Sequence, residues 1–216
     1  MIELKKERIF THSSLEINPT ILFYLLCNSC EDSQLQDIIK PVNTDSRHQI
    51  PPPSHQQIVS QIIEIWSQAT EILTESSIVQ LCGDDKRAKI AIAAGAATSY
   101  GCPLDRISLS WLVALLNSSA SSFTLEKFIK LYSRFALLTD SILLIDCEEI
   151  NSTEPTEIPL LNQLLSKSHT PIIIITNRRI NFADRSTLPI DIPKLTPDEQ
   201  ATIWRNHLGE TAAELG

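Results

Sequence analysis

Hydrophobic positions along the chain follow two different spacings. Apolar side chains recur every three or four positions in five segments, which predicts helices at 56–75, 89–99, 124–138, 158–165 and 197–208. Shorter segments that are apolar at nearly every position predict strands at 77–82, 141–146, 171–176 and 188–192. Segment 105–116 mixes a short strand pattern with an apolar run, so its assignment stays open.

Strands that are apolar on both faces and alternate with helices predict an α/β fold, with a parallel sheet covered by helices on both sides. In such folds ligands bind at the carboxyl ends of the strands. The residues that directly follow each predicted strand are therefore the first place to look for function.

The predicted sheet is preceded by a change in composition. Residues 40–54 are polar and contain four of the twelve prolines, which predicts an extended or polyproline linker at 41–54. Residues 1–40 then form a small N-terminal helical segment with an apolar run at 21–26, and residues 55–216 form the main domain. About 40 residues rarely build a core of their own, so we expect this segment to dock on the main domain or on another subunit.

Composition narrows the class of protein. The chain of 216 residues has 18 Lys and Arg against 26 Asp and Glu, a net charge of −8, which disfavours binding to nucleic acid or to a membrane surface. No segment reaches the roughly 18 apolar residues of a membrane helix, and the charged residues 1–8 lack the apolar run of a secretory signal. Five scattered cysteines are an odd number, so we expect a reduced, cytoplasmic protein.

The residues after the first predicted strand match a phosphate-binding loop in part. That loop reads Gly-x-x-x-x-Gly-Lys-Ser/Thr, and it offers backbone N–H groups, a lysine for phosphate and a hydroxyl for magnesium. Gly83 and Lys89 stand in register with it, whereas Ala88 and Ile90 replace the second glycine and the hydroxyl. In the left-handed turn that a glycine allows, Ala88 would cost about 1–2 kcal/mol.

We therefore predict a cofactor-binding segment that comprises Gly83, Asp84, Asp85, Lys86, Arg87, Ala88, Lys89 and Ile90. An ordinary strand-to-helix turn with solvated charges is the alternative.

Polar residues also end the next two apolar strands. Asp146 is placed to hold a magnesium ion and Glu148 to activate a water molecule. The usual pair is Asp-Glu in immediate succession. Here Cys147 intervenes, so Glu148 would lie on the opposite side of an extended chain from the position of that glutamate. Asn177 follows the third strand and could orient a water or contact a γ-phosphate. The alternatives are a solvated acidic turn and an asparagine that ends a strand.

Taken in order, these three sites resemble the core of an AAA+ ATPase with eroded motifs. Walker A would lie at 83–90, Walker B at 142–148 and sensor 1 at Asn177, while 188–209 looks like the last core strand and first lid helix of a bacterial AAA+ group. The resemblance covers residues 55–216 and implies ATP and Mg²⁺ as cofactors, with strand order 5-1-4-3-2 in a P-loop core. It also implies Arg185 as an arginine finger that acts on a neighbouring subunit.

The resemblance implies one function and leaves a second open. The first is an ATP-binding module that forms a homo-oligomer or joins a partner protein, and that remodels proteins through ATP turnover. The second is a degenerate, non-hydrolysing subunit that keeps the fold for protein interaction. The replaced loop residues favour the second, whereas retention of Lys89, Asp146 and Asn177 favours residual nucleotide binding. A nucleic-acid motor fits the charge of −8 poorly. The resemblance leads us to expect a helical lid that is absent or incomplete in residues up to Gly216, either because the sequence is a fragment or because the protein lacks a lid.

Overall fold

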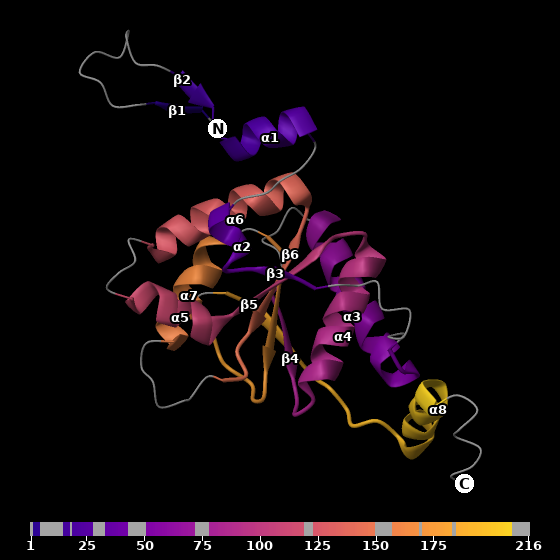
Figure 1. Ribbon diagram of the computed structural model, residues 1–216. Coiled ribbons are helices and arrows are strands. Elements are labelled where there is room, and N and C mark those ends of the chain that lie inside the picture. Colours follow the sequence, from indigo (N-terminus) through magenta and orange to yellow (C-terminus); the bar gives the residue numbers. More distant parts are fainter. Residues whose placement is uncertain are drawn as a thin grey trace.

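A six-stranded mixed sheet forms the centre of the computed structural model (Figure 1). The structure describes residues 2–4, 15–17, 19–27, 33–42, 51–71, 78–118, 123–149, 157–168, 170–182 and 185–208. The strands of this sheet are β3 (Lys40–Pro41), β4 (Ile78–Cys82), β5 (Leu104–Ser108), β6 (Ile142–Asp146), β7 (Ile172–Thr176) and β8 (Thr187–Asp191). Their order across the sheet is β3-β5-β6-β7-β4-β8.

The five strands from β4 to β8 are parallel, which confirms the predicted α/β class. Numbered along the chain and counted from the β8 edge, their order is the expected 5-1-4-3-2. The sequence did not predict β3, which pairs antiparallel with β5 through Lys40↔Arg106 and Pro41↔Asp105. Proline is tolerated there because β3 lies at the sheet edge.

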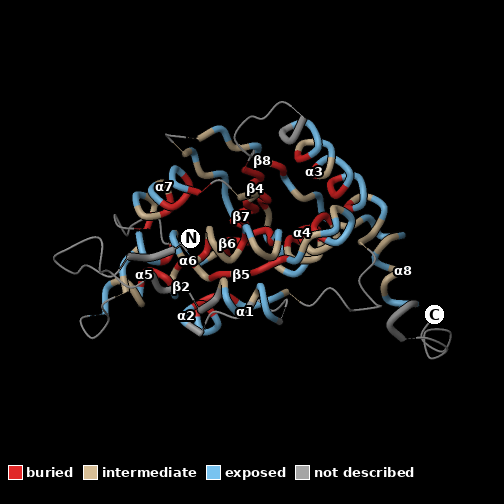
Figure 2. Tube along the Cα trace, turned by 90° about the horizontal axis from the view of Figure 1, so that it is seen from above, coloured by how far each residue is buried: buried red, intermediate tan, exposed pale blue. Residues whose placement is uncertain are grey.

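Helices cover both faces of the sheet (Figure 2). Their bounds are α2 (Ser33–Gln36), α3 (Pro53–Glu71), α4 (Lys86–Tyr100), α5 (Leu109–Asn117), α6 (Leu125–Thr139), α7 (Glu157–Lys167) and α8 (Pro197–Leu208). Helices α3 and α4 bury their apolar residues against one face, and α2, α5, α6 and α7 against the other. No helix in the described part of the chain is long and apolar enough to cross a membrane.

The two cores receive alternate residues of the same strands. In β7, Ile172 and Ile174 face the core beneath α5–α7, whereas Ile173 and Ile175 face the core beneath α3 and α4. Successive side chains of a strand point to opposite faces, so a strand buried on both sides is apolar throughout. This is the physical origin of the uniformly apolar segments in the sequence.

The open segment 105–116 divides between β5 and α5. The hydroxyl of Ser108 accepts a hydrogen bond from the N–H of Trp111 at 3.3 Å, so Ser108 caps the new helix. The strand pattern is hidden in the sequence because β5 carries Asp105 and Arg106 opposite the short edge strand. A strand and a helix therefore meet without an intervening loop.

Residues before and within the predicted linker take part in the main domain. Leu35, Ile38 and Ile39 are buried in the core beneath α6. Pro41 lies in β3, and Pro53 is the first residue of α3, where the missing N–H of proline is not needed. Residues 43–50 of the predicted linker lie outside the described residues.

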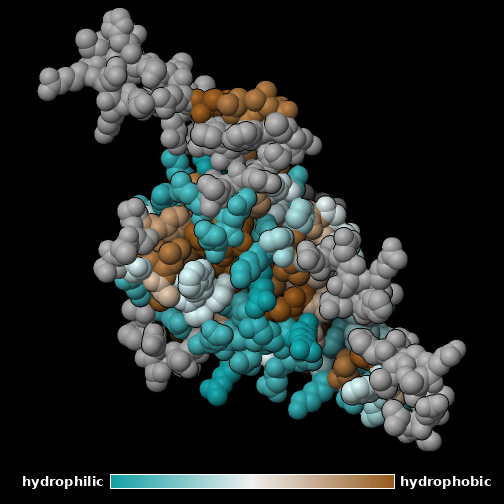
Figure 3. All heavy atoms as spheres, viewed as in Figure 1, coloured by the Kyte–Doolittle hydropathy of each residue, from teal (hydrophilic) through white to brown (hydrophobic). Residues whose placement is uncertain are grey.

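The N-terminal part contains a strand pair and a helix. Strands β1 (Ile2–Leu4) and β2 (Leu15–Ile17) are antiparallel, and α1 (Pro19–Cys27) follows. Leu25 and Leu26 of α1 are 67% and 72% exposed, large values for leucine. Figure 3 shows the apolar surface of this helix near the top of the molecule.

Candidate functional site

The predicted site lies where the carboxyl ends of β4, β6 and β7 meet the start of α4. Gly83 follows β4 with a φ of +152°, a conformation that disfavours any other residue. Its N–H donates to the carbonyl of Thr176 at the end of β7 (3.2 Å), which ties the two strand ends together. A glycine at this position therefore serves the turn itself, with or without a phosphate.

Helix α4 begins at Lys86, three residues before Lys89. Asp85 is its N-cap, and the Oδ1 atom of Asp85 accepts from the N–H groups of Arg87 (2.9 Å) and Ala88 (3.0 Å). These N–H groups are among those that a phosphate would need. Residues 86–90 of the expected loop are helical, and the anion at the helix start is the chain's own carboxylate.

The helical start of α4 also changes the interpretation of Ala88. Among the described residues, Asp140 is the sole non-glycine residue with a positive φ. Ala88 therefore lies in a conformation that alanine favours, and the cost of 1–2 kcal/mol expected for a left-handed turn does not arise.

Lys89 lies at the centre of the site and is fully buried, with 0% of its surface exposed. Its Nζ atom forms an ion pair with Oε1 of Glu148 at 2.5 Å. It also donates to the carbonyls of Gly83 and Thr176 (2.5 and 2.9 Å) and to Oδ1 of Asn177 (3.2 Å). The acceptors of this chain thus already surround the ammonium group that would contact phosphate.

A second group of charges surrounds Asp146. Its Oδ2 atom pairs with Nζ of Lys86 at 2.8 Å and with Nη2 of Arg106 at 2.5 Å. Lys86 also reaches Oε2 of Glu148 at 3.3 Å. We call Lys86, Lys89, Arg106, Asp146 and Glu148 the ionic network; it connects α4, β5 and the end of β6.

The ionic network shifts two pKa values in directions that favour the charged forms. Burial raises the pKa of Asp146, but hydrogen bonds from Lys86 and Arg106 outweigh it, so this pKa falls below its ordinary value. Burial likewise lowers the pKa of Lys86, but Asp146 and Glu148 outweigh it and raise this pKa. The two side chains are thus held as an ion pair.

Asp146 and Glu148 lie on the same side of the chain, since Nζ of Lys86 contacts both carboxylates. A turn follows β6, and the N–H of Glu148 donates to Oδ1 of Asp146 at 3.3 Å. Cys147 is buried beneath this turn, and its N–H donates to the carbonyl of Ile175. Cys147 thus stands where the usual second carboxylate would lie, and the role of Glu148 in activating a water stays a prediction.

Asn177 joins the same site, whereas Arg185 does not. The Nδ2 atom of Asn177 donates to the carbonyl of Glu148 at 3.3 Å, and its Oδ1 atom accepts a hydrogen bond from Nζ of Lys89. The Nη1 atom of Arg185 donates to the carbonyls of Leu165 and Ser168 at the end of α7. That Arg185 acts as an arginine finger on a neighbouring subunit stays a prediction. Within this chain its guanidinium caps the carboxyl end of α7.

Asp84 and Arg87, the two remaining residues of the predicted segment, are exposed. Asp84 borders a cavity of about 650 Å³ together with Glu148 and Asn177. The sequence placed Lys86 in the cofactor-binding segment but not in an ion pair with Asp146, and the prediction missed Arg106 altogether. A charged residue inside a strand was the one available signal for Arg106.

A magnesium ion does not fit this arrangement. Mg²⁺ binds carboxylate oxygens and water in octahedral geometry, but Oδ2 of Asp146 faces two cationic side chains. Ile90 supplies no hydroxyl. Within the described residues, no group of three or more His, Cys, Asp or Glu side chains could hold a metal ion.

Comparison with known proteins supports the fold. No family model and no curated protein matches the sequence. Among solved structures, the chain is similar to PCH-2 of C. elegans, an AAA+ ATPase, with a TM-score of 0.55 and 12% sequence identity. The match covers 82% of this chain and 53% of that chain, about half the length of PCH-2. The chain therefore has an α/β fold that is consistent with an AAA+-like core.

Proposed function

We propose that this protein is a non-hydrolysing AAA+-like module that acts in protein assembly. The observation that carries the proposal is the closed state of the expected phosphate site: α4 begins early, Asp85 caps it, and Lys89 is fully buried against Glu148. For a nucleotide to enter, these contacts must break, and removing a buried ion pair's partner costs about 3–5 kcal/mol.

The assembly role is supported by exposed apolar side chains. Leu25 and Leu26 on α1, Leu137 on α6 (78% exposed) and Trp204 on α8 (64% exposed) lie at the surface. Two adjacent leucines on one short helix form a contiguous apolar patch, and such patches mark protein contacts. A homo-oligomer or a complex with a partner protein would cover them.

The test is titration of a fluorescent ATP analogue into the purified chain, with and without magnesium, followed by sedimentation velocity on the same samples. We expect no magnesium-dependent binding up to millimolar analogue, and self-association that is independent of nucleotide. An active AAA+ ATPase serves as the positive control. Magnesium-dependent binding that Lys89→Ala abolishes would overturn the proposal and favour the ATP-binding alternative.

A further inference from the structure

A second cavity, of about 590 Å³, lies at the other edge of the sheet, beside β3 and β5. We call it the edge cavity. The apolar side chains of Ile38, Val42 and Ile90 line it; Ile38 and Val42 flank β3, and Ile90 lies on α4. Its volume falls within the range of about 300–1,000 Å³ that is typical of sites for small ligands.

The indole of Trp111 forms one wall of the edge cavity and is 53% exposed, whereas Trp66 is 2% exposed in the core. Trp111 lies in the first turn of α5, directly after β5. Figure 3 shows apolar surface in the middle of this face, bordered by hydrophilic residues. An exposed indole beside aliphatic side chains offers a planar surface that an apolar ligand would cover.

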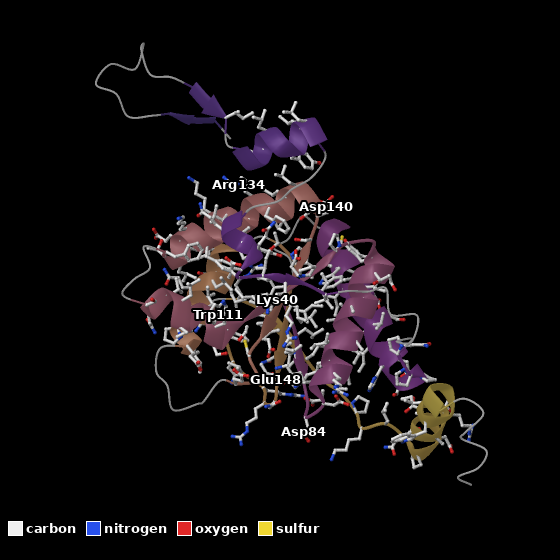
Figure 4. All side chains as sticks on the ribbon, viewed as in Figure 1. Lys40, Asp84, Trp111, Arg134, Asp140 and Glu148 are labelled. Atoms are coloured by element: carbon white, nitrogen blue, oxygen red, sulfur yellow. The ribbon has the colours of Figure 1, made fainter. Side chains whose placement is uncertain are left out.

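The polar side chains of the edge cavity include two cations, Lys40 and Arg106. Lys40 is exposed and lies near Trp111 in Figure 4. It forms no ion pair with any other part of the described chain. Arg106 uses Nη2 for Asp146 and keeps 35% of its side chain exposed, so further N–H groups of its guanidinium can receive a ligand. Asp37 is the carboxylate that borders the same cavity.

The charges around the edge cavity favour an anion. Among the charged residues that line the cavity, two are the cations Lys40 and Arg106 and one is the carboxylate Asp37. The balance at the cavity is therefore positive in a chain whose net charge is −8. Buried or half-buried positive charge draws a carboxylate more strongly than exposed charge does, because less water screens it.

We propose that the edge cavity binds a small amphipathic anion, namely a carboxylate attached to an apolar chain or ring. The apolar body lies against Trp111, Val42 and Ile90, and the carboxylate accepts hydrogen bonds from Lys40 and Arg106. The cavity adjoins the expected phosphate site through Ile90 and Arg106, but Lys89 and Asn177 do not line it. It stands whether or not the protein binds nucleotide.

The test uses three probes of equal chain length that differ in head-group charge: octanoate, octylamine and octanol. Calorimetric titration into the full chain should show octanoate binding at least about tenfold more tightly than the other two, because charge-assisted hydrogen bonds contribute about that much. In a Trp204→Phe background, octanoate should also shift the emission of Trp111 to shorter wavelength.

Two variants and one control locate the binding site. Lys40→Gln should weaken octanoate binding about tenfold, and Trp111→Ala should abolish the measurable heat. Lys167→Gln, a lysine on α7 that pairs with Glu126 far from the cavity, should leave the affinity unchanged. Thermal unfolding followed by circular dichroism checks that every variant folds.

Equal affinity for the three probes would overturn the proposal, because the site would then select apolar chains alone. Octanoate binding that survives both Lys40→Gln and Trp111→Ala would overturn it as well, since the anion would then bind elsewhere. No heat with octanoate up to millimolar concentration would also overturn it.

Discussion

The ionic network and the edge cavity share Arg106 but differ in how far their charged side chains are buried and paired. In the network, Lys89 is 0% exposed and each carboxylate contacts at least one cation within 3.3 Å. At the edge cavity, Lys40 is exposed and Trp111 is 53% exposed. The first region resembles the interior of a folded domain, and the second resembles a ligand site.

This difference changes where binding is expected. In an AAA+ ATPase the carboxyl ends of the strands receive the nucleotide, but here side chains of the chain itself occupy that position. Asp85 takes the place of an anion at the start of α4, and Glu148 contacts the lysine. The open polar and apolar groups lie at the edge of the sheet instead. Each of the following variants measures how much one contact at the expected phosphate site contributes to stability.

The largest effect is expected for Lys89→Met. Methionine keeps the volume but leaves Glu148 and Asn177 without their buried cation, so the free energy of unfolding should fall by about 3–5 kcal/mol. Urea unfolding at neutral pH measures this change. Lys86→Met is the matched control; its side chain is 34% exposed and Arg106 still pairs with Asp146, so a clearly smaller loss is expected.

The double variant Lys89→Met/Glu148→Gln sharpens the result. If the pair itself is responsible, removing both charges should restore part of the lost stability. Equal stability of Lys89→Met and the unchanged protein would mean that the lysine is not held as the structure has it.

A smaller effect is expected for Asp85→Ala. Loss of the N-cap leaves the N–H groups of Arg87 and Ala88 without their acceptor, which should cost about 1 kcal/mol. Asp85→Asn is the control, because asparagine caps helices about as well. A loss of stability in both variants would point to the charge of Asp85 rather than to its hydrogen bonds.

The smallest effect is expected in the pH dependence of the free energy of unfolding. The folded pKa of Asp146 lies below its ordinary value of 3.8, because its hydrogen bonds from Lys86 and Arg106 outweigh burial. Asp146 therefore adds stability that is complete above the unfolded pKa and is lost as the pH falls through the folded pKa. The stability gap between the unchanged protein and Asp146→Asn should narrow from about pH 5 to about pH 2. A constant gap over that range would contradict the assignment.

Much of the sheet could be predicted from the sequence. Segments such as 141–146 and 171–176 are apolar at nearly every position because both faces of β6 and β7 are buried. Helix α8 was predicted at its observed bounds, since Thr196 can cap it and Pro197 suits its first position. The structure adds a capping box: the N–H of Glu199 donates to the hydroxyl of Thr196, and Glu199 accepts from the N–H of Thr196. These are local signals that need no partner elsewhere in the chain.

Which charged side chains meet at the expected phosphate site depended on tertiary structure. The sequence predicts that Gly83, Lys89, Asp146 and Asn177 lie at the same edge of the sheet, since the carboxyl ends of parallel strands meet there. It could not show that α4 begins at Lys86 or that Glu148 turns back toward Lys89, because a one-turn shift of a helix start leaves the motif spacing unchanged. Lys40 and Trp111 come together only because β3 adds to the sheet edge beside β5. Apolar patterns fix which faces are buried, but contacts between distant segments decide which charges meet.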